Sequence, residues 1–537
     1  MEQMGSKPAR RRRPSAHLIG AATALGLIAG LILALSSFGD DDRAAPTPAP
    51  SAVGSPRASA PGAQRASATV PERDSVPVSV TFDLNRPGPP VPPRFLGLSF
   101  ELSSLRQIAA YASGGDLVTL LRSLGPGVLR FGGVSADTRV AWSDPLTPRP
   151  PWASAVIEAG DLRRLGRLAA LTGWPVLLTV GLAHFDSAAA AREAAAAKRA
   201  LGRNLAGIEL GNEPDAYMKH GFRRPPWTFS QYNAQVSAYR RAIAKAAPGI
   251  PLVGPDVSGS AVFRTWGRGE AIYQRPALLT GHHYPLGCHA MPAPTIARLL
   301  SPQIRRLEDT SVRRYTSVSR ARGIGFRLDE TNTVSCGGRT GISDTFASAL
   351  WAVDYVARTM AAGMAGINFQ AAPANCAGYS ALCAATPEGL AKGALHAQPE
   401  WYALLLARAL VGARPVRTIL RAPRGRNVDV TSFLTGDGRL MSVIVDDDPP
   451  AARPIAISLH VGRRFAGASI LALTAPSPAA RSGVELGSRA VAADGSWSKP
   501  AQLSRRANRR GIITLAVAPS SAVLATITPR SGTRPTR

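Results

Sequence analysis

Two glutamates carry the clearest chemical signal in this chain, because each follows a short apolar run. Glu213 lies in the string GNEPD after residues 205–210, and Glu330 lies in the string RLDETN after residues 323–326. The apolar runs are bounded by glycine and are too brief for helices, so they are read as buried strands. Both glutamates are therefore predicted where a strand ends and a loop begins. Two such carboxylates are the minimum equipment for cleaving a glycosidic bond.

That reaction requires two carboxyl groups in different protonation states. One gives a proton to the departing oxygen, while the other is ionised and attacks the anomeric carbon. A second negative charge nearby favours the protonated form of Glu213, so we predict Glu213 as the acid/base and Glu330 as the nucleophile. Arg130 and Tyr284 are the predicted donors that keep Glu330 anionic, and Asn212 offers an amide to a substrate hydroxyl. Direct attack needs carboxyl groups about 5 to 5.5 Å apart.

Strands and helices alternate from about residue 94 onward, which indicates an α/β fold. Eight strand–helix units imply a (β/α)8 TIM barrel over residues 85–411. A doubly wound open sheet is the competing fold, but no glycine-rich phosphate loop follows the first strand. Barrel enzymes carry their active sites at the C-terminal strand ends, where both glutamates fall. The predicted strands are residues 95–100, 127–132, 174–180, 205–210, 251–256, 278–284, the run leading to Glu330, and residues 365–370.

Other polar residues near the two glutamates have structural interpretations. Glu209 shares the strand parity of Glu213 but lies deeper in the barrel, so we expect a buried ion pair with an arginine. Asp329 is expected to point away from Glu330. His282 is predicted as a sugar-hydroxyl contact and His283 as a packing residue, because adjacent histidines on a strand face opposite sides. No third ligand has a matching spacing, so neither a metal nor another cofactor is expected.

The remainder of the chain divides into a second domain and two terminal segments. Short alternating segments predict an antiparallel β-sandwich over residues 412–529, followed by a disordered tail over residues 530–537. A strand over residues 76–84 is expected to join the sandwich, because a closed barrel offers it no edge.

The N-terminal sequence predicts export. A basic segment (residues 1–17) precedes an apolar stretch (residues 18–38), which reads as a signal-anchor with its basic flank in the cytoplasm. A signal peptide cleaved near Ala34-Leu35-Ser36 is the alternative. A disordered linker rich in Pro, Ala and Ser follows over residues 39–75. The cysteines suit an oxidising compartment, and their spacing favours the pairs Cys376–Cys383 and Cys288–Cys336.

Composition excludes a wholly disordered chain and leaves the meaning of the charge open. The 537 residues carry a formal net charge of +28. That charge suits an anionic partner such as an acidic polysaccharide, although an arginine-rich composition of the source explains it equally. The basic residues are scattered and not interleaved with aromatic residues, so no nucleic-acid partner is expected.

Several strings of the barrel, in the same order, resemble glycoside hydrolase family 79, the heparanase and β-glucuronidase family of retaining (β/α)8 glycosidases. The string around Glu213 indicates only the wider clan, whereas HHY, SDTFA and AGY narrow the resemblance to the family. The matching strings are residues 129–133, 209–215, 254–257, 282–284, 329–331, 343–347 and 377–379.

The resemblance implies substrate contacts in addition to the two glutamates. The uronate carboxylate contact of the family falls on Gly378 and Tyr379, and Lys219 corresponds to a basic contact in heparanase-like members. Gly337 is a further predicted contact, although the aromatic residue found beside the corresponding glycines is missing here. The Cys376–Cys383 pair also constrains the uronate loop differently.

The expected activity is therefore hydrolysis of a uronic-acid-containing oligo- or polysaccharide. Exo-acting β-glucuronidase and endo-acting heparanase-like activity both stay open. The alternative enzyme is a clan relative that cleaves neutral sugars such as arabinofuranosides or xylosides. The alternatives that are not enzymes are a carbohydrate-binding surface protein and a basic adhesin. The short segment over residues 142–152 offers no room for a long excised linker, so a single uncleaved chain is expected. A monomer is expected as well.

Overall fold

A computed structural model describes residues 74–498 and 500–530. Within them, eight parallel strands close into a barrel in the order β10-β11-β2-β3-β6-β7-β8-β9. Closure excludes the doubly wound open sheet and confirms the predicted (β/α)8 barrel. The barrel strands are β2 (Leu96–Glu101), β3 (Val128–Gly132), β6 (Val176–Val180), β7 (Leu205–Leu210), β8 (Leu252–Val257), β9 (Leu278–His283), β10 (Phe326–Thr331) and β11 (Gly366–Ala371).

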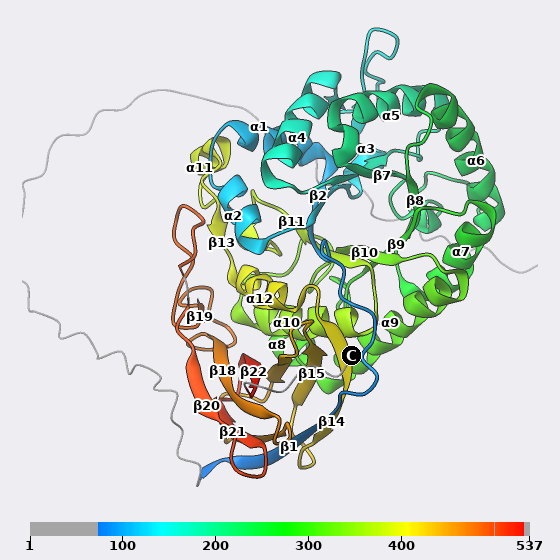
Figure 1. Cartoon of the computed structure of the whole chain (residues 1–537). Coiled ribbons are helices and arrows are strands. Elements are labelled where there is room, and N and C mark those ends of the chain that lie inside the picture. Colours follow the sequence, from blue (N-terminus) through cyan, green and yellow to red (C-terminus); the bar gives the residue numbers. More distant parts are fainter. Residues whose placement is uncertain (1–73, 499, 531–537) are drawn as a thin grey trace, which may run out of the picture. The chain divides into compact units, whose positions relative to one another are not determined.

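Helices surround these strands, as Figure 1 shows for α4 to α7 and α9. Local sequence fixes several helix starts: the Asp186 carboxylate accepts hydrogen bonds from two backbone N–H groups of α5, and Ser301 caps α9 in front of Pro302. The longer helices are α2 (Leu117–Leu124), α4 (Ala159–Thr172), α5 (Ser187–Leu201), α6 (Phe229–Ala246), α7 (Ser260–Tyr273), α9 (Pro302–Arg322), α10 (Phe346–Ala361) and α12 (Pro399–Ala407).

Shorter elements lie in the connections of the barrel. Two small strand pairs, β4 with β5 and β12 with β13, occur among the described residues. These elements are α1 (Leu105–Ala110), α3 (Ser135–Thr138), α8 (Ile296–Leu299), α11 (Pro387–Lys392), β4 (Val140–Trp142), β5 (Ala155–Ile157), β12 (Leu382–Cys383), β13 (His396–Ala397) and the 3-10 turns η2 (Leu102–Ser104), η3 (Tyr111–Ser113), η4 (Gly202–Asn204), η5 (Pro214–Ala216) and η6 (Arg408–Leu410).

The barrel strands are readable in the sequence because both of their faces are covered. Strands β3, β6, β10 and β11 are buried at every position. A strand buried on both faces needs a nearly continuous apolar run instead of alternation. Charged residues on such strands are therefore exceptions, and they are concentrated on β10 as Arg327, Asp329 and Glu330.

The other strands of the described chain form a ten-stranded, mostly antiparallel sheet in the order β19-β18-β22-β16-β15-β14-β1-β17-β21, with β20 paired to β18. Its strands are β1 (Val76–Asp83), β14 (Arg414–Arg421), β15 (Val428–Leu434), β16 (Leu440–Asp446), β17 (Ile455–His460), β18 (Phe465–Thr474), β19 (Glu485–Leu486), β20 (Leu503–Arg506), β21 (Ile512–Val517) and β22 (Ser521–Pro529).

This sheet folds over one apolar core. Strand β14 pairs with β15 through residues 414–416 and with β1 through residues 417–421, so it belongs to both halves of the sheet. Buried side chains from both halves, including Val80 of β1 and Ile444 of β16, share one hydrophobic cluster. Such face-to-face packing is that of a β-sandwich. Strand β1 pairs antiparallel with β14 and parallel with β17.

A group of buried charges joins α9 and α10 of the barrel to the sandwich. Arg305 contacts Asp354 at 3.0 Å and Asp447 of the sandwich at 2.6 Å. Arg358 contacts Asp354 at 3.1 Å. Further Arg358 contacts are made with Glu308 and Asp309, both at 2.6 Å. We refer to Arg305, Glu308, Asp309, Asp354, Arg358, Asp429 and Asp447 as the interface cluster.

The predicted disulfide pairs are confirmed, because Cys288 bonds to Cys336 and Cys376 bonds to Cys383. The predicted basic segment (1–17) and apolar stretch (18–38), nearly all of the linker (39–75) and the end of the tail (530–537) lie outside the described residues. Across the part of the chain that is described, no helix has both the length and the apolar character needed to cross a membrane.

Candidate active site

Glu213 lies just beyond the C-terminal end of β7 in a tight turn. Gly211 has φ of 81° and Glu213 itself has φ of 48°, a left-handed conformation that is unusual for a residue with a side chain. A Cβ on Gly211 would collide with the Tyr217 hydroxyl. The backbone N–H of Glu213 donates to the Asp256 carbonyl at 2.9 Å, which ties the turn to β8. The Glu213 side chain is 27% exposed and faces a cavity.

Glu330 lies near the end of β10 and is more enclosed, with 10% of its side chain exposed. Arg130 donates to Oε2 at 2.7 Å, and the Tyr284 hydroxyl donates to Oε1 at 2.8 Å. These are the two donors predicted for this carboxylate. Each oxygen of Glu330 therefore has a donor that fixes the orientation of the carboxylate.

The ring of His282 lies close to both glutamates and so limits the distance between them. Its Nδ1 is 3.0 Å from Oε1 of Glu213 and 4.0 Å from Oε1 of Glu330, so these two oxygens are at most about 7 Å apart. The bound, which holds for this one pair of oxygens, admits the carboxyl separation of about 5 to 5.5 Å that direct attack needs.

Arg130 is the centre of the charged residues beneath the cavity, and it is completely buried. It contacts Glu209 at 2.9 Å, Asp256 at 2.8 Å and Glu330 at 2.7 Å. Burial by itself lowers the pKa of Arg130, but the surrounding carboxylates raise it well above its usual value. We call Arg130, Glu209, Asp256, Asp329 and Glu330 the Arg130 cluster. The expected ion pair of Glu209 with an arginine is present.

His282 differs from the expected sugar contact. It is fully buried, and its ring nitrogens contact Glu213 at 3.0 Å and Asp256 at 2.8 Å. Burial lowers the pKa of His282, but the negative charges of Asp256 and Glu330 outweigh that effect and raise it well above its ordinary value. His282 is therefore an imidazolium that donates to both carboxylates. Its neighbour His283 packs against Tyr355 with ring centroids 5.8 Å apart.

The prediction that Asp329 points away from Glu330 is wrong. Oδ2 of Asp329 lies 3.6 Å from Arg130, which Glu330 also contacts, and Oδ1 accepts from the backbone N–H of Gly281 at 2.9 Å. The pairing of β10 with β9 changes register between Leu328 and Glu330, and this irregularity interrupts the alternation of side chains. Burial and the charges of Asp256 and Glu209 raise the pKa of Asp329 well above its usual value.

A cavity of about 750 Å³ opens above the two glutamates. Asn212, Lys219, Gly337 and Tyr379 line it, together with Tyr284 and both glutamates. The Tyr379 hydroxyl is 3.5 Å from that of Tyr284, and the Tyr379 N–H donates to the Gly337 carbonyl at 3.1 Å. Most of the predicted substrate contacts therefore converge here.

Three predicted contacts lie behind the wall of the cavity. Arg130 and His282 are fully buried and contact protein groups, as described above. Gly378 is buried, and a Cβ at this position would collide with the Gly337 carbonyl. A glycine is therefore required at residue 378 for the two loops to approach each other.

Two functional carboxyls were not predicted from the sequence. Asp137 is buried and accepts from the Asn212 N–H at 2.8 Å and the Tyr217 hydroxyl at 2.6 Å, so it positions the turn that carries Glu213. Glu101 ends β2 and lines the cavity, and burial and the charge of Glu330 raise its pKa. Its position directly after a predicted strand was the signal that could have identified Glu101.

Two groups of the described residues have ligand atoms close enough to hold a metal ion, but neither has suitable chemistry. Asp256, His282 and Asp329 converge within 4.8 Å, yet the guanidinium of Arg130 lies against the two aspartates and opposes a second cation. The other group contains Cys288 and Cys336, whose sulfurs are joined in a disulfide and cannot act as thiolate ligands.

Comparison with known proteins gives one sequence relative and many structural ones. No family model matches the chain. A β-glucuronidase of Aspergillus niger is 31% identical over 181 residues, which are 30% of this chain and 33% of that protein. The matched region therefore spans about a third of the length of the curated relative.

Solved structures match over most of the chain. A 4-O-α-L-rhamnosyl-β-D-glucuronidase from Fusarium oxysporum has a TM-score of 0.66 and 18% identity, covering 83% of this chain and 100% of its own. A family 51 arabinofuranosidase from Xanthomonas axonopodis has a TM-score of 0.61 and 14% identity, and the match covers 84% of this chain and 100% of that protein. At such identities the likeness concerns the fold. The chain thus shares the fold of these glycosidases and a segment of sequence with a β-glucuronidase.

Proposed function

We propose that this protein is a retaining β-glycosidase that hydrolyses uronic-acid-containing glycans. The observation that carries the proposal is the pair Glu213 and Glu330, whose nearest oxygens are at most about 7 Å apart beside one cavity and have different partners. A retaining mechanism requires such a pair, with one carboxylate fixed as an anion and the other free to exchange a proton.

In the first step, Glu330 attacks the anomeric carbon while Glu213 protonates the departing oxygen. The bond to the leaving group breaks as the bond to Glu330 forms. In the second step, Glu213 takes a proton from water, the water oxygen attacks the same carbon, and Glu330 leaves as a carboxylate. Arg130 and Tyr284 stabilise that carboxylate before the first step and after the second.

His282 assists the proton transfer without contacting the sugar. Its hydrogen bond uses Oε1 of Glu213, so Oε2 is the oxygen that exchanges the proton. When Glu213 gives up its proton, the imidazolium stabilises the carboxylate that forms, and Asp256 holds the imidazolium in place at 2.8 Å.

The preference for a uronate is supported by the cavity wall and by the two glucuronidase relatives. Lys219 is an exposed ammonium group on this wall, and Tyr379 presents a hydroxyl close to that of Tyr284. A carboxylate on the substrate would accept hydrogen bonds from both. Gly378 would contribute through its backbone, since no side chain fits there.

The same proposal covers location and assembly. We expect an exported, monomeric protein that acts outside the cytoplasm, because both cysteine pairs form disulfides. Residues 18–38 would anchor it to the membrane, or be removed as a signal peptide. The glycan is the expected partner, and no nucleic acid is expected.

A neutral-sugar glycosidase is the second candidate. The arabinofuranosidase from Xanthomonas axonopodis matches with a TM-score of 0.61, close to the 0.66 of the glucuronidase, so fold does not separate the two substrate classes.

The test is a panel of chromogenic glycosides that includes a β-glucuronide, a β-xyloside and an α-arabinofuranoside. We expect cleavage of the glucuronide, with Glu213→Gln and Glu330→Gln each losing activity and the exposed Glu485→Gln retaining it. Hydrolysis of the neutral glycosides without the glucuronide would overturn the uronate assignment.

Azide separates the roles of the two glutamates. It should restore turnover of Glu330→Ala by attacking the substrate directly and yield the α-glycosyl azide. With Glu213→Ala it should attack the covalent intermediate and yield the β-glycosyl azide. The opposite pair of products, identified by NMR, would reverse the assignment.

A further inference from the structure

A second cavity of about 460 Å³ lies beside the catalytic one. Leu102 lines the second cavity, whereas its neighbour Glu101 lines the catalytic cavity. Likewise Ala136 lines the second cavity and Val134, which is 51% exposed, lines the first. The two cavities therefore flank the same loops after β2 and β3, and Val134 lies at the ridge between them. The volume lies within the range of small-ligand sites, about 300 to 1,000 Å³.

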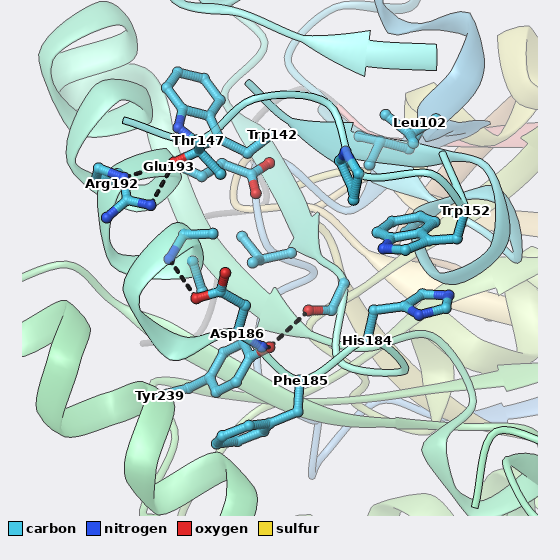
Figure 2. A pocket seen from close by; sticks show the side chains of 18 of the residues that line it. Leu102, Trp142, Thr147, Trp152, His184, Phe185, Asp186, Arg192, Glu193 and Tyr239 are labelled. Carbon is cyan, nitrogen blue, oxygen red and sulfur yellow. Dashed lines mark hydrogen bonds between the residues drawn. The ribbon is translucent and has the colours of Figure 1, made fainter. Parts of the chain in front are cut away.

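Aromatic side chains form much of the wall of the second cavity. The ring of Trp152 stacks on that of His184, with centroids 3.9 Å apart and an angle of 8° between the planes. Trp142, Phe185 and Tyr239 also line the cavity. In Figure 2, Trp142 and Glu193 are drawn to the left of the cavity and Trp152 with His184 to the right.

Most polar groups of this cavity already have partners. Trp142 donates to Asp144, which does not line the cavity, at 2.8 Å, and Arg192 pairs with the same carboxylate at 3.4 Å. Asp186 caps α5, and the Tyr239 hydroxyl accepts from the Asp186 N–H at 2.9 Å. These groups maintain the shape of the cavity and have little capacity left for a ligand.

Glu193 is the exception. Its residue surface is only 5% exposed, it lines the cavity, and no hydrogen bond or ion pair joins it to another described residue. Its carboxyl oxygens remain accessible from the cavity, so a ligand there can form hydrogen bonds with them. Burial alone raises the pKa of Glu193 to about 8, so near neutral pH the group offers one O–H donor and one carbonyl acceptor.

These features together suit a sugar ring better than a cation. A protonated carboxyl matches the hydroxyl groups of a sugar, and aromatic rings such as Trp152 pack against its apolar face. Arg192, which lines the cavity, would repel a cationic ligand, and the carboxylate of Asp186 already caps α5.

We propose that the second cavity binds a neutral sugar unit of the same glycan whose uronate end occupies the catalytic cavity. This inference rests on the proposed function. A chain that passes over Val134 would contact Trp152 at the entrance and Glu193 inside, so its length and composition would determine how well it is cleaved.

The first test is kinetic and compares an aryl β-glucuronide with glucuronides of a neutral mono-, di- and trisaccharide. We expect kcat/KM to rise with chain length in the native protein. Trp152→Ala and Glu193→Leu should each reduce the advantage of the long substrates over the aryl substrate by about tenfold. Tyr273→Ala, which removes an exposed aromatic residue elsewhere, should retain it. An advantage that is absent, or that persists in both variants, overturns the proposal.

The second test measures binding by calorimetry to the Glu330→Gln protein, with neutral trisaccharides and with choline as probes. Glu193→Gln should bind the sugar within about threefold of its parent, because a neutral amide replaces a neutral acid. Choline binding that Glu193→Gln abolishes, without sugar binding, would overturn the proposal in favour of a cation site. If the native protein cleaves no glucuronide, sugar binding that depends on Trp152 would support the second site and refute the proposed function separately.

Discussion

The Arg130 cluster and the interface cluster have the same chemistry but different surroundings. In both, buried arginines contact several carboxylates at 2.6 to 3.6 Å. The Arg130 cluster lies below a cavity, and its Glu330 and the adjacent Glu213 keep part of their side chains exposed there. The interface cluster lies between α9, α10 and the sandwich. Burial of a charge network alone therefore does not mark a catalytic site; the candidate site also exposes two carboxylates to a cavity.

The two clusters should differ in whether loss of an arginine affects catalysis as well as stability. Burying two ions costs desolvation that their attraction only partly offsets, yet removing one partner leaves an uncompensated charge and costs about 3 to 5 kcal/mol. Both clusters should respond in this way to loss of an arginine. Activity should respond only where the released carboxylate takes part in the reaction.

The largest effect is expected for Arg130→Met. Loss of the guanidinium leaves three carboxylates without their common partner and removes one of two donors from Glu330. We expect kcat/KM to fall by about 10³-fold or more, and the free energy of unfolding by about 3 to 5 kcal/mol. Enzyme assays and denaturant titration measure the two quantities. Arg130→Lys keeps the charge but not the fork of donors, so it should recover stability more than activity.

Arg358→Met is the counterpart at the interface cluster. Its guanidinium contacts Glu308, Asp309 and Asp354, none of which lines the catalytic cavity. The free energy of unfolding should again fall by about 3 to 5 kcal/mol, while kcat/KM at 25 °C stays within about twofold. The exposed Arg313→Met is the matched control and should change neither quantity. Loss of activity in a folded Arg358→Met protein would remove the distinction between the clusters.

His282→Gln sharpens the comparison within the active site. The amide replaces an imidazolium that the neighbouring carboxylates keep protonated by raising its pKa. We expect kcat/KM to fall by about 10- to 100-fold. Glu213 loses the cation that donates to its Oε1, so the loss should be larger with a substrate whose leaving group needs acid assistance than with an activated aryl glucuronide. Equal losses with the two substrates would contradict the role given to His282.

The last effect, the smallest per pH unit, concerns the pH dependence of the interface cluster. Burial and the charge of Asp354 raise the pKa of Asp429 to about 7. Because the folded pKa exceeds the unfolded one, the proton on Asp429 stabilises the fold fully below about pH 4, and this contribution is lost as pH rises through about 7. Asp429→Asn should make the decline of unfolding free energy between pH 4 and 7 shallower by up to about 1.4 kcal/mol per pH unit. An unchanged slope would mean that Asp429 is ionised in the folded protein.

The features predicted correctly from the sequence were those that follow from local sequence pattern and from the general geometry of a barrel. The barrel strands were recognisable because strands buried on both faces need continuous apolar runs, and the Arg130 and Tyr284 partners of Glu330 followed from strand ends that converge in a barrel. The position of Asp329 was not predictable, because a change of register on β10 disturbs the alternation on which the expectation depended. His282 was misread because strand position does not reveal that Asp256 and Glu213 occupy both ring nitrogens.

The sequence by itself determined the order of strands and helices and the two glutamates at strand ends, and it favoured the cysteine pairs without fixing them, since these features depend on spacing along the chain. Tertiary structure alone decided which carboxyls share Arg130, which histidine is an imidazolium and where Glu193 lacks a partner. The physical reason is that charge state and hydrogen bonding depend on burial and on neighbours from distant segments, such as Arg130 and Glu330, 200 residues apart.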